Sequence, residues 1–281
     1  MSEEYRNPEE EASEAAETKG KKKKEKVKKT VGQEILSWIV TIVVAVVAAL
    51  VIRSFIFEPV RVDGESMMDT LKDGDIMFVS KWDYDSVWLS LPWQSASQKE
   101  AAPRLAVGLG SPARFDVVVC RYPGRGDTNF VKRIIGMPGD VVAIEDGYVY
   151  VNGEKYDEPY INDAYRVAGG SNGQTYEATY VPAAGDTIQA KDGHLYINGE
   201  QRDDVVRLYP VSAGHQEETE AFYAAMDSGE EYTVQQDLYL VMGDHRNNSN
   251  DSRSVGPITR DMIIGHVRFV FWPLSTIRGV E

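Results

Sequence analysis

The chain has 281 residues, a formal net charge of −14 and a single cysteine, Cys120. One cysteine excludes an intrachain disulfide, so the folded part must rest on an apolar core. Residues 54–281 carry 20 basic and 35 acidic side chains, a net charge of −15, which argues against nucleic acid as a partner because phosphates would be repelled.

The N-terminal region is charged and nearly free of apolar groups. Residues 1–17 carry seven Glu and one Arg, and residues 19–29 carry eight Lys and one Glu. Such a composition cannot bury enough apolar surface to fold. The sequence therefore predicts that residues 1–33 form a disordered tail, which is acidic first and then Lys-rich.

The most apolar stretch, Ile35–Ile52, has 18 residues without a charge. As a helix it would span about 27 Å, close to the ~30 Å hydrocarbon core of a bilayer. It is apolar on every face, unlike a core helix, and longer than the ~7–15-residue apolar region of a cleavable signal peptide. We therefore predict one uncleaved transmembrane anchor over 34–54. Because the lysines lie on its N-terminal side, we expect the tail in the cytoplasm and residues 55–281 as an extracytoplasmic domain.

Beyond the anchor, runs rich in Val, Ile, Phe and Tyr are bounded by turn residues, a pattern typical of β-strands. These runs cover 116–122, 129–136, 140–154, 238–244 and 266–272. A helical pattern is confined to 218–226. We predict a mainly β fold: an antiparallel, β-rich domain with several hairpins and with accessory insertions at about 83–114 and 155–235.

One internal repeat stands out: residues 139–154 align without gaps onto residues 185–200, with eight of 16 positions identical. Each copy predicts two strands joined by an Asp-Gly turn and followed by an Asn-Gly turn, because both dipeptides suit tight turns with positive φ. Two interpretations stay open, a true duplication and two unrelated hairpins with the same turn chemistry.

Three stretches carry the candidate chemistry, and they lie around Ser66, around Lys132 and over residues 243–253. Lys132 could serve as a base for Ser66 if burial lowers its pKa from about 10.4. In a strand, Phe130 and Ile134 would flank Lys132 on its own face, while Arg133 would point towards solvent. The alternative is a strand lysine that reaches solvent at a sheet edge.

The stretches GESMMDTL, KRIIGMPGD and GDHRNNSNDSR resemble, in that order, the three signature motifs of type I signal peptidases, the bacterial leader peptidases. The single anchor just upstream is similar to the Gram-positive form of that family. The resemblance implies a membrane-anchored serine endopeptidase that uses a Ser/Lys dyad. It implies that the enzyme cleaves signal peptides from exported preproteins after Ala-x-Ala-type sites, near the protein export channel, with no cofactor and no metal.

The resemblance also assigns roles to individual residues. Ser66 matches the nucleophile, and its backbone N–H would contribute to the oxyanion hole. Lys132 matches the general base, Ser249 the serine that orients the lysine amine, and Asp251 and Arg253 the charged pair that supports the site.

Four further positions of the motifs bear on the substrate and the nucleophile. Met67 and Phe130 are candidate substrate-binding residues, although Met67 equally fits core packing. Gly64 stands where some members have a serine that supplies a second oxyanion donor, and Asp69 stands where many have proline.

Three other interpretations compete with this one. A Ser-His-Asp hydrolase would use His245 or His266, but the Gly-x-Ser-x-Gly pattern around a nucleophilic serine is absent at Ser66. A self-cleaving repressor-type peptidase would need a DNA-binding domain in place of the anchor. A non-enzymatic, membrane-anchored β-domain would leave the three motifs unexplained. Cys120 is predicted to be a buried strand residue.

Overall fold

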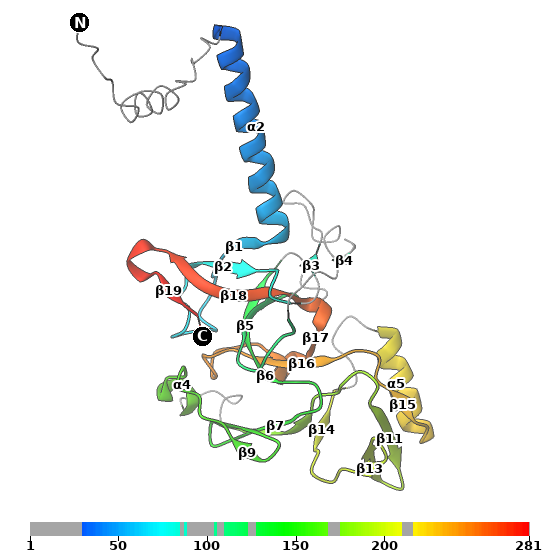
Figure 1. Ribbon diagram of the computed structural model, residues 1–281. Helices are drawn as coiled ribbons and strands as arrows, with labels where there is room; N and C mark the ends of the chain where they lie inside the picture. Colours follow the sequence, from blue (N-terminus) through cyan, green and yellow to red (C-terminus); the bar gives the residue numbers. More distant parts are fainter. Residues whose placement is uncertain are drawn as a thin grey trace, which may run out of the picture. The chain divides into compact units, whose positions relative to one another are not determined.

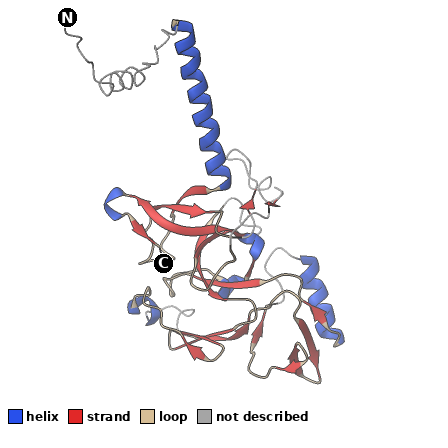
Figure 2. Cartoon of the chain, in the orientation of Figure 1, coloured by secondary structure: helices blue, strands red, loops and turns tan. Residues whose placement is uncertain are grey.

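The computed structural model describes residues 30–84, 87–88, 104–105, 110–122, 128–167, 175–209 and 216–280 (Figure 1). Among these, strands dominate beyond the first helix (Figure 2), and all strand pairs but one are antiparallel. The prediction of a mainly antiparallel β fold preceded by one long apolar helix is confirmed. Residues 1–29 of the predicted disordered tail and most of the predicted insertion at 83–114 lie outside the described residues, whereas residues 31–33 of that tail belong to the first helix.

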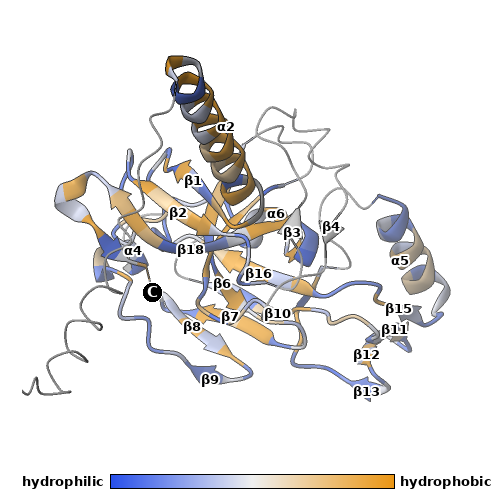
Figure 3. Cartoon of the chain, turned by 45° about the horizontal axis from the view of Figure 1, so that its top comes forward, coloured by the Kyte–Doolittle hydropathy of each residue, from blue (hydrophilic) through white to orange (hydrophobic). Residues whose placement is uncertain are grey.

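The first described element is helix α2, Val31–Phe55. Most of its length is coloured as hydrophobic (Figure 3), and none of the span Val31–Arg53 is buried by protein. At 1.5 Å per residue, 23 residues reach about 35 Å, enough to cross a bilayer. By length and composition, α2 is therefore a candidate membrane span, and it contains the whole of the predicted anchor.

The largest sheet has eight strands in the order β1-β2-β18-β5-β6-β16-β17, with β19 paired to β18. Four of the five predicted strand runs contribute to it, each within three residues of its predicted bounds. The strands of this sheet are β1 (Phe57–Arg61), β2 (Ile76–Ser80), β5 (Val117–Cys120), β6 (Phe130–Gly136), β16 (Leu238–Met242), β17 (Ile258–Thr259), β18 (Ile263–Trp272) and β19 (Arg278–Gly279).

Strand β5 is buried on both faces of this sheet. Val117 and Val119 pack into one apolar cluster, whereas Val118 and Cys120 pack into another, as the alternation of side chains along a strand requires. Cys120 is fully buried, as predicted. The next strand, β6, lies between β5 and β16, so it is a central strand as well. Its side chains on both faces must therefore also find partners inside the protein.

A second sheet has the order β14-β10-β7-β8-β9, and a third has the order β13-β12-β11-β15. The third sheet packs against helix α5, Gln216–Ser228, which contains the predicted helix. The strands are β7 (Val141–Glu145), β8 (Tyr148–Val151), β9 (Glu154–Lys155), β10 (Tyr176–Tyr180), β11 (Thr187–Lys191), β12 (His194–Ile197), β13 (Glu200–Gln201), β14 (Arg207–Leu208) and β15 (Tyr232–Thr233).

The remaining described elements are short. They are the strand pair β3 and β4 (Val87–Trp88 and Arg104–Leu105), the helices α4 (Asp163–Val167) and α6 (Ser252–Val255), and the 3-10 turns η1 (Arg260–Met262) and η2 (Leu274–Thr276). Two strands from the region predicted as an insertion at 155–235, β10 and β14, extend the sheet of β7 and β8.

The two copies of the sequence repeat form the same three-stranded unit, β7-β8-β9 and β11-β12-β13. Asn152 Nδ2 donates to Asp140 Oδ1 over 3.0 Å in the first copy, and Asn198 Nδ2 donates to Asp186 Oδ1 over 2.9 Å in the second. These matching contacts join the last turn of each copy to its first residues. Because the likeness extends beyond the local turn chemistry, it favours duplication over two unrelated hairpins.

Candidate functional site

Ser66 lies on the loop between β1 and β2, and core packing fixes this loop. Met67 and Leu71 are buried in the same cluster, so two side chains of the loop point into the protein. At the base of the loop, Val62 N donates to the carbonyl oxygen of Asp75 over 2.8 Å and Gly74 N donates to the carbonyl oxygen of Val62 over 3.0 Å. Gly64 N donates to Asp73 Oδ1 over 2.9 Å. The core contacts and these hydrogen bonds therefore fix the turn that carries the half-buried Ser66.

The structure brings Lys132 and Ser66 together across 66 residues of sequence. Lys132 Nζ donates to Ser66 Oγ over 2.7 Å and to the carbonyl oxygen of Val131 over 2.9 Å. Lys132 lies on β6 opposite Val118, and its side chain is 2 % exposed. The pair therefore has the geometry that proton transfer from a serine to a neutral lysine requires.

Burial lowers the pKa of the Lys132 amine, against the opposing field of the Asp251 carboxylate. The cause is the loss of hydration of the charged form in an apolar setting. Ile134 and the half-buried Phe130 belong to the cluster on this face of β6, as the strand pattern predicted. Burial also raises the pKa of the Cys120 thiol to about 12, which keeps Cys120 un-ionised beside the site.

The prediction that Arg133 points towards solvent is wrong. Arg133 is fully buried, because β6 is central and its second face is covered as well. Its guanidinium donates to both oxygens of Asp244 over 3.0 and 2.8 Å, and Thr70 Oγ1 donates to Asp244 Oδ2 over 2.6 Å. Arg133 thus ties the strand that carries Lys132 to the loop that carries Ser66.

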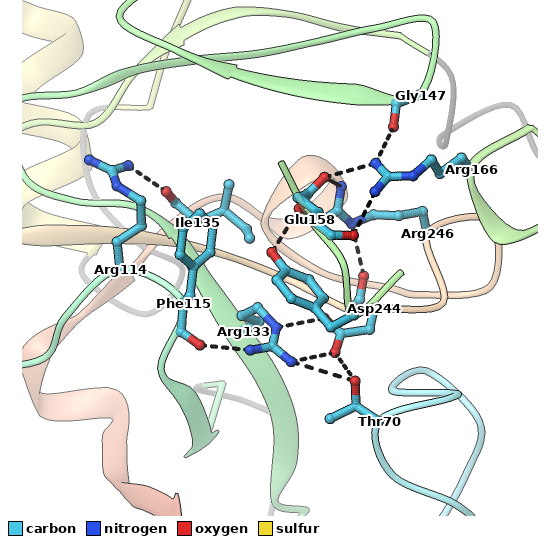
Figure 4. A network of polar contacts seen from close by, with 12 residues as sticks. Thr70, Arg114, Phe115, Arg133, Ile135, Gly147, Glu158, Arg166, Asp244 and Arg246 are labelled. Atoms are coloured by element: carbon cyan, nitrogen blue, oxygen red, sulfur yellow. Dashed lines mark hydrogen bonds and ion pairs between the residues drawn. The ribbon is translucent and has the colours of Figure 1, made fainter. Parts of the chain in front are cut away.

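A second buried ion cluster lies beside the first (Figure 4). Glu158, 1 % exposed, accepts hydrogen bonds from Arg246, from Arg166 Nη1 over 3.1 Å and from Tyr160 Oη over 2.8 Å. The guanidinium of Arg133 lies over the ring of Tyr160, 3.7 Å from its centroid. The two clusters therefore form one network.

The third motif connects β16 to α6, and Asp251 organises its end. The Asp251 carboxylate accepts from Arg253 Nε and Nη2, both over 2.8 Å, and from the backbone N–H of Gly243 over 2.9 Å. Burial alone would raise the pKa of Asp251, but Arg253 holds it below its ordinary value. Ser249 Oγ is buried, and within the described residues no hydrogen bond joins it to Lys132.

The two predicted substrate-binding residues lie on different sides of the sheet. Met67 is 2 % exposed and packs in the core, as the alternative interpretation had it. Phe130 is half-buried and meets Tyr122 edge to face, with ring centroids 5.2 Å apart. Gly64 has no side chain, so it provides no second side-chain donor near Ser66. Its φ of 106° is a conformation that favours glycine at this position.

The histidines of the competing hydrolase interpretation have other partners. His245 Nδ1 lies 3.0 Å from the carbonyl oxygen of Glu65, and His266 lies 3.5 Å from Asp83 and 3.7 Å from Asp116. Among the described residues, neither histidine is hydrogen-bonded to the Ser66 hydroxyl, and no group of His, Cys, Asp or Glu side chains has the arrangement of a metal site.

The sequence model described as "Signal peptidase, peptidase S26" matches residues 35–183 and 179–272. The chain belongs to this family. All three motifs and the Ser66–Lys132 pair fall within the matched ranges, so the geometry above is that of a signal peptidase family member.

Individual relatives agree with this assignment. Signal peptidase IB of Staphylococcus aureus is 30% identical over 246 residues, 88% of this chain and 94% of that protein. Signal peptidase I of Pseudomonas fluorescens is 31% identical over 73% of this chain, which spans only 57% of the length of that relative. A solved signal peptidase I from Enterococcus faecalis is 22% identical, covers 57% of this chain and 99% of its own, and has a TM-score of 0.32, which supports no statement about the fold.

Sequence reasoning missed the residues that contact the motifs from outside them. Glu158 and Arg166 complete the ion network of this family member, and Asn162 and Tyr165 contact the Ser66 loop. They fall in the stretch predicted as an accessory insertion. A single glutamate or asparagine in a polar stretch carries no signal of burial or of a distant partner.

Gly243 is a further residue on which the site depends, because a Cβ there would overlap Ser249 Oγ and the carbonyl oxygen of Ser66. We expect Gly243→Ala to lower kcat/KM for a peptide with an Ala-x-Ala site by about a hundredfold, since displacing a reacting group by about 1 Å costs that much. Gly279→Ala is the control, because a Cβ there meets nothing within 4 Å. Equal activity of the two variants would contradict the expectation.

Proposed function

We propose that this chain is a membrane-anchored serine endopeptidase that cleaves signal peptides from exported preproteins after small residues, at Ala-x-Ala-type sites. Family membership and one contact support the proposal: the 2.7 Å hydrogen bond between Lys132 Nζ and Ser66 Oγ. A serine hydroxyl is a weak nucleophile without a base, and a buried lysine with a lowered pKa supplies that base.

The reaction then proceeds through an acyl-enzyme. Ser66 Oγ attacks the carbonyl carbon of the residue before the scissile bond while neutral Lys132 takes the hydroxyl proton. Lys132 returns this proton to the departing amine, and the peptide bond breaks. Lys132 next accepts a proton from water, whose oxygen attacks the ester carbonyl. As the ester bond breaks, Lys132 returns this proton to Ser66 Oγ, which frees Ser66. The backbone N–H of Ser66 donates to the oxyanion.

The register of β6 leaves room for an extended substrate. Strand β16 pairs with β6 only from Arg133 to Gly136, so among the described strands Phe130–Lys132 is paired by β5 alone. A signal-peptide segment can add there as a strand, with main-chain hydrogen bonds for affinity and small pockets for side-chain selection. The segment would run beside the chain that precedes Ser66.

The anchor places this chemistry at a membrane. Helix α2 spans the bilayer, with the lysine-rich residues 19–29 in the cytoplasm and the catalytic domain on the outer side. The enzyme would meet preproteins as they leave the export channel. Because enzyme and preprotein are confined to the same membrane, they encounter each other more often.

The lowered pKa of Lys132 gives the pH test. We expect kcat/KM for an Ala-x-Ala peptide to rise with pH along an acidic limb whose midpoint lies below about 10.4, the ordinary lysine pKa. The sign follows from the role: the base must be neutral, so activity is present above its pKa and is lost as pH falls through it. Lys191→Ala, at an exposed lysine of β11, should leave the profile unchanged. A rate that is flat between about pH 5 and 9 would contradict a lysine base.

A further inference from the structure

The segment 156–167 runs from the end of β9 through α4 and contacts both loops of the candidate active site. It lies outside the three sequence motifs, yet it meets the third motif at Arg246 and the Ser66 loop at Asp69. These two contacts differ in kind, because the first is buried and the second is at the surface.

The buried contact fixes the segment in place. Glu158 is bonded to Arg246 through both carboxylate oxygens. Arg166, at the far end of the segment, returns to Glu158, with Nη1 on its carboxylate over 3.1 Å and Nη2 on its carbonyl oxygen over 2.8 Å. The segment is therefore closed on itself and fastened to the third motif.

The surface contact engages both oxygens of a single carboxylate. Asn162 Nδ2 donates to Asp69 Oδ2 over 3.1 Å, and Tyr165 Oη donates to Asp69 Oδ1 over 3.5 Å. Asn162 Oδ1 accepts from Ala164 N over 3.0 Å, which orients the amide so that Nδ2 faces Asp69. Asp69 lies three residues after Ser66, on the exposed side of the loop.

The same segment reaches the other side of Ser66 through a histidine. The Tyr165 and His245 rings lie with centroids 3.9 Å apart. His245 in turn donates its backbone N–H to the carbonyl oxygen of Ser66 over 3.1 Å, and its Nδ1 lies 3.0 Å from the carbonyl oxygen of Glu65. Tyr165 thus supports the loop on both sides of the nucleophile.

We infer that Asp69, Asn162 and Tyr165 are positioning residues, which hold the Ser66 loop so that Ser66 Oγ stays within hydrogen-bond distance of Lys132 Nζ. The inference rests on the proposed function, in which Ser66 is the nucleophile. Core packing holds Met67 and Leu71 from the inner side of the loop, whereas the 156–167 segment holds it from the outer side.

A reversal of one hydrogen bond tests the inference. Asn162→Asp replaces the amide donor with a carboxylate that repels Asp69. The new carboxylate can still accept the hydrogen bond from Ala164 N. We expect about a tenfold fall in kcat with little change in KM, because a hydrogen bond to a charged group contributes on the order of the 1.4 kcal/mol that equals tenfold in rate. Adding Asp69→Asn restores a donor–acceptor pair in the opposite sense and should return kcat to within about twofold of wild type.

Two controls separate positioning from stability and from the proposed function. Asp163→Asn makes the reverse exchange one residue away, where the side chain is 89% exposed and lies 3.5 Å from Arg166 Nε. Because a surface ion pair contributes little, this variant should leave kcat unchanged. Wild-type kcat in Asn162→Asp overturns the inference, and so does a fall in kcat that the double variant does not restore. Those results leave the proposed function standing if Ser66→Ala is inactive in the same assay, whereas an active Ser66→Ala overturns both.

Discussion

Lys132→Met is expected to abolish peptide cleavage while the protein stays folded. Removing a general base costs about 10²–10⁴-fold, and without it the Ser66 hydroxyl keeps its proton, so we expect a loss of about a thousandfold in kcat. Methionine has a similar length and is apolar, so it suits the buried site between β5 and β6. The carbonyl oxygen of Val131 loses a donor, which costs about 1–3 kcal/mol of stability at most.

A second buried lysine provides the matched control. Lys81 is 3 % exposed and pairs with Glu58 over 2.7 Å. Lys81→Met breaks an ion pair whose lysine is buried and whose glutamate is 22% exposed, so it should lower the free energy of unfolding more than Lys132→Met does but keep the turnover rate. The measurements are kcat on an Ala-x-Ala peptide and urea unfolding of the full chain in detergent. Turnover within about tenfold of wild type in Lys132→Met would exclude Lys132 as the general base.

The strands of the main sheet could be predicted because their sequences report burial directly. The run Val117–Cys120 is apolar at every position and forms a central strand. Helix α4 could not be predicted in this way, since its five residues are too few to show a helical period. It is stabilised by contacts with distant residues such as Asp69 and Gly147.

The environment of Arg133 shows where strand alternation stops being informative. Alternation correctly puts Arg133 on the face opposite Lys132, but it does not say what covers that face. The cover includes Asp244, which is 111 residues away in the sequence and neutralises the buried guanidinium. The strand pattern likewise leaves Lys132 with two interpretations, a buried base for Ser66 and a lysine that reaches solvent at a sheet edge. Only the family resemblance favours the first of them.

Glu158→Gln is expected to destabilise the protein by about 3–5 kcal/mol, the usual cost of removing one partner from a buried ion pair. In the buried network three guanidiniums, of Arg133, Arg166 and Arg246, meet two carboxylates, of Asp244 and Glu158. The variant leaves three positive charges with one negative charge. Glutamine has almost the same shape as glutamate, so the loss reports charge and hydrogen bonding and not packing.

An exposed pair of the same chemistry supplies the comparison. Glu177 pairs with Arg207 where the two side chains are 51% and 46% exposed, so Glu177→Gln should cost less than about 1 kcal/mol. Urea unfolding followed by tryptophan fluorescence gives both values. A cost for Glu158→Gln no larger than that for Glu177→Gln would contradict the expectation. Because Glu158 also fastens the 156–167 segment, kcat of this variant should fall even at temperatures at which it remains folded.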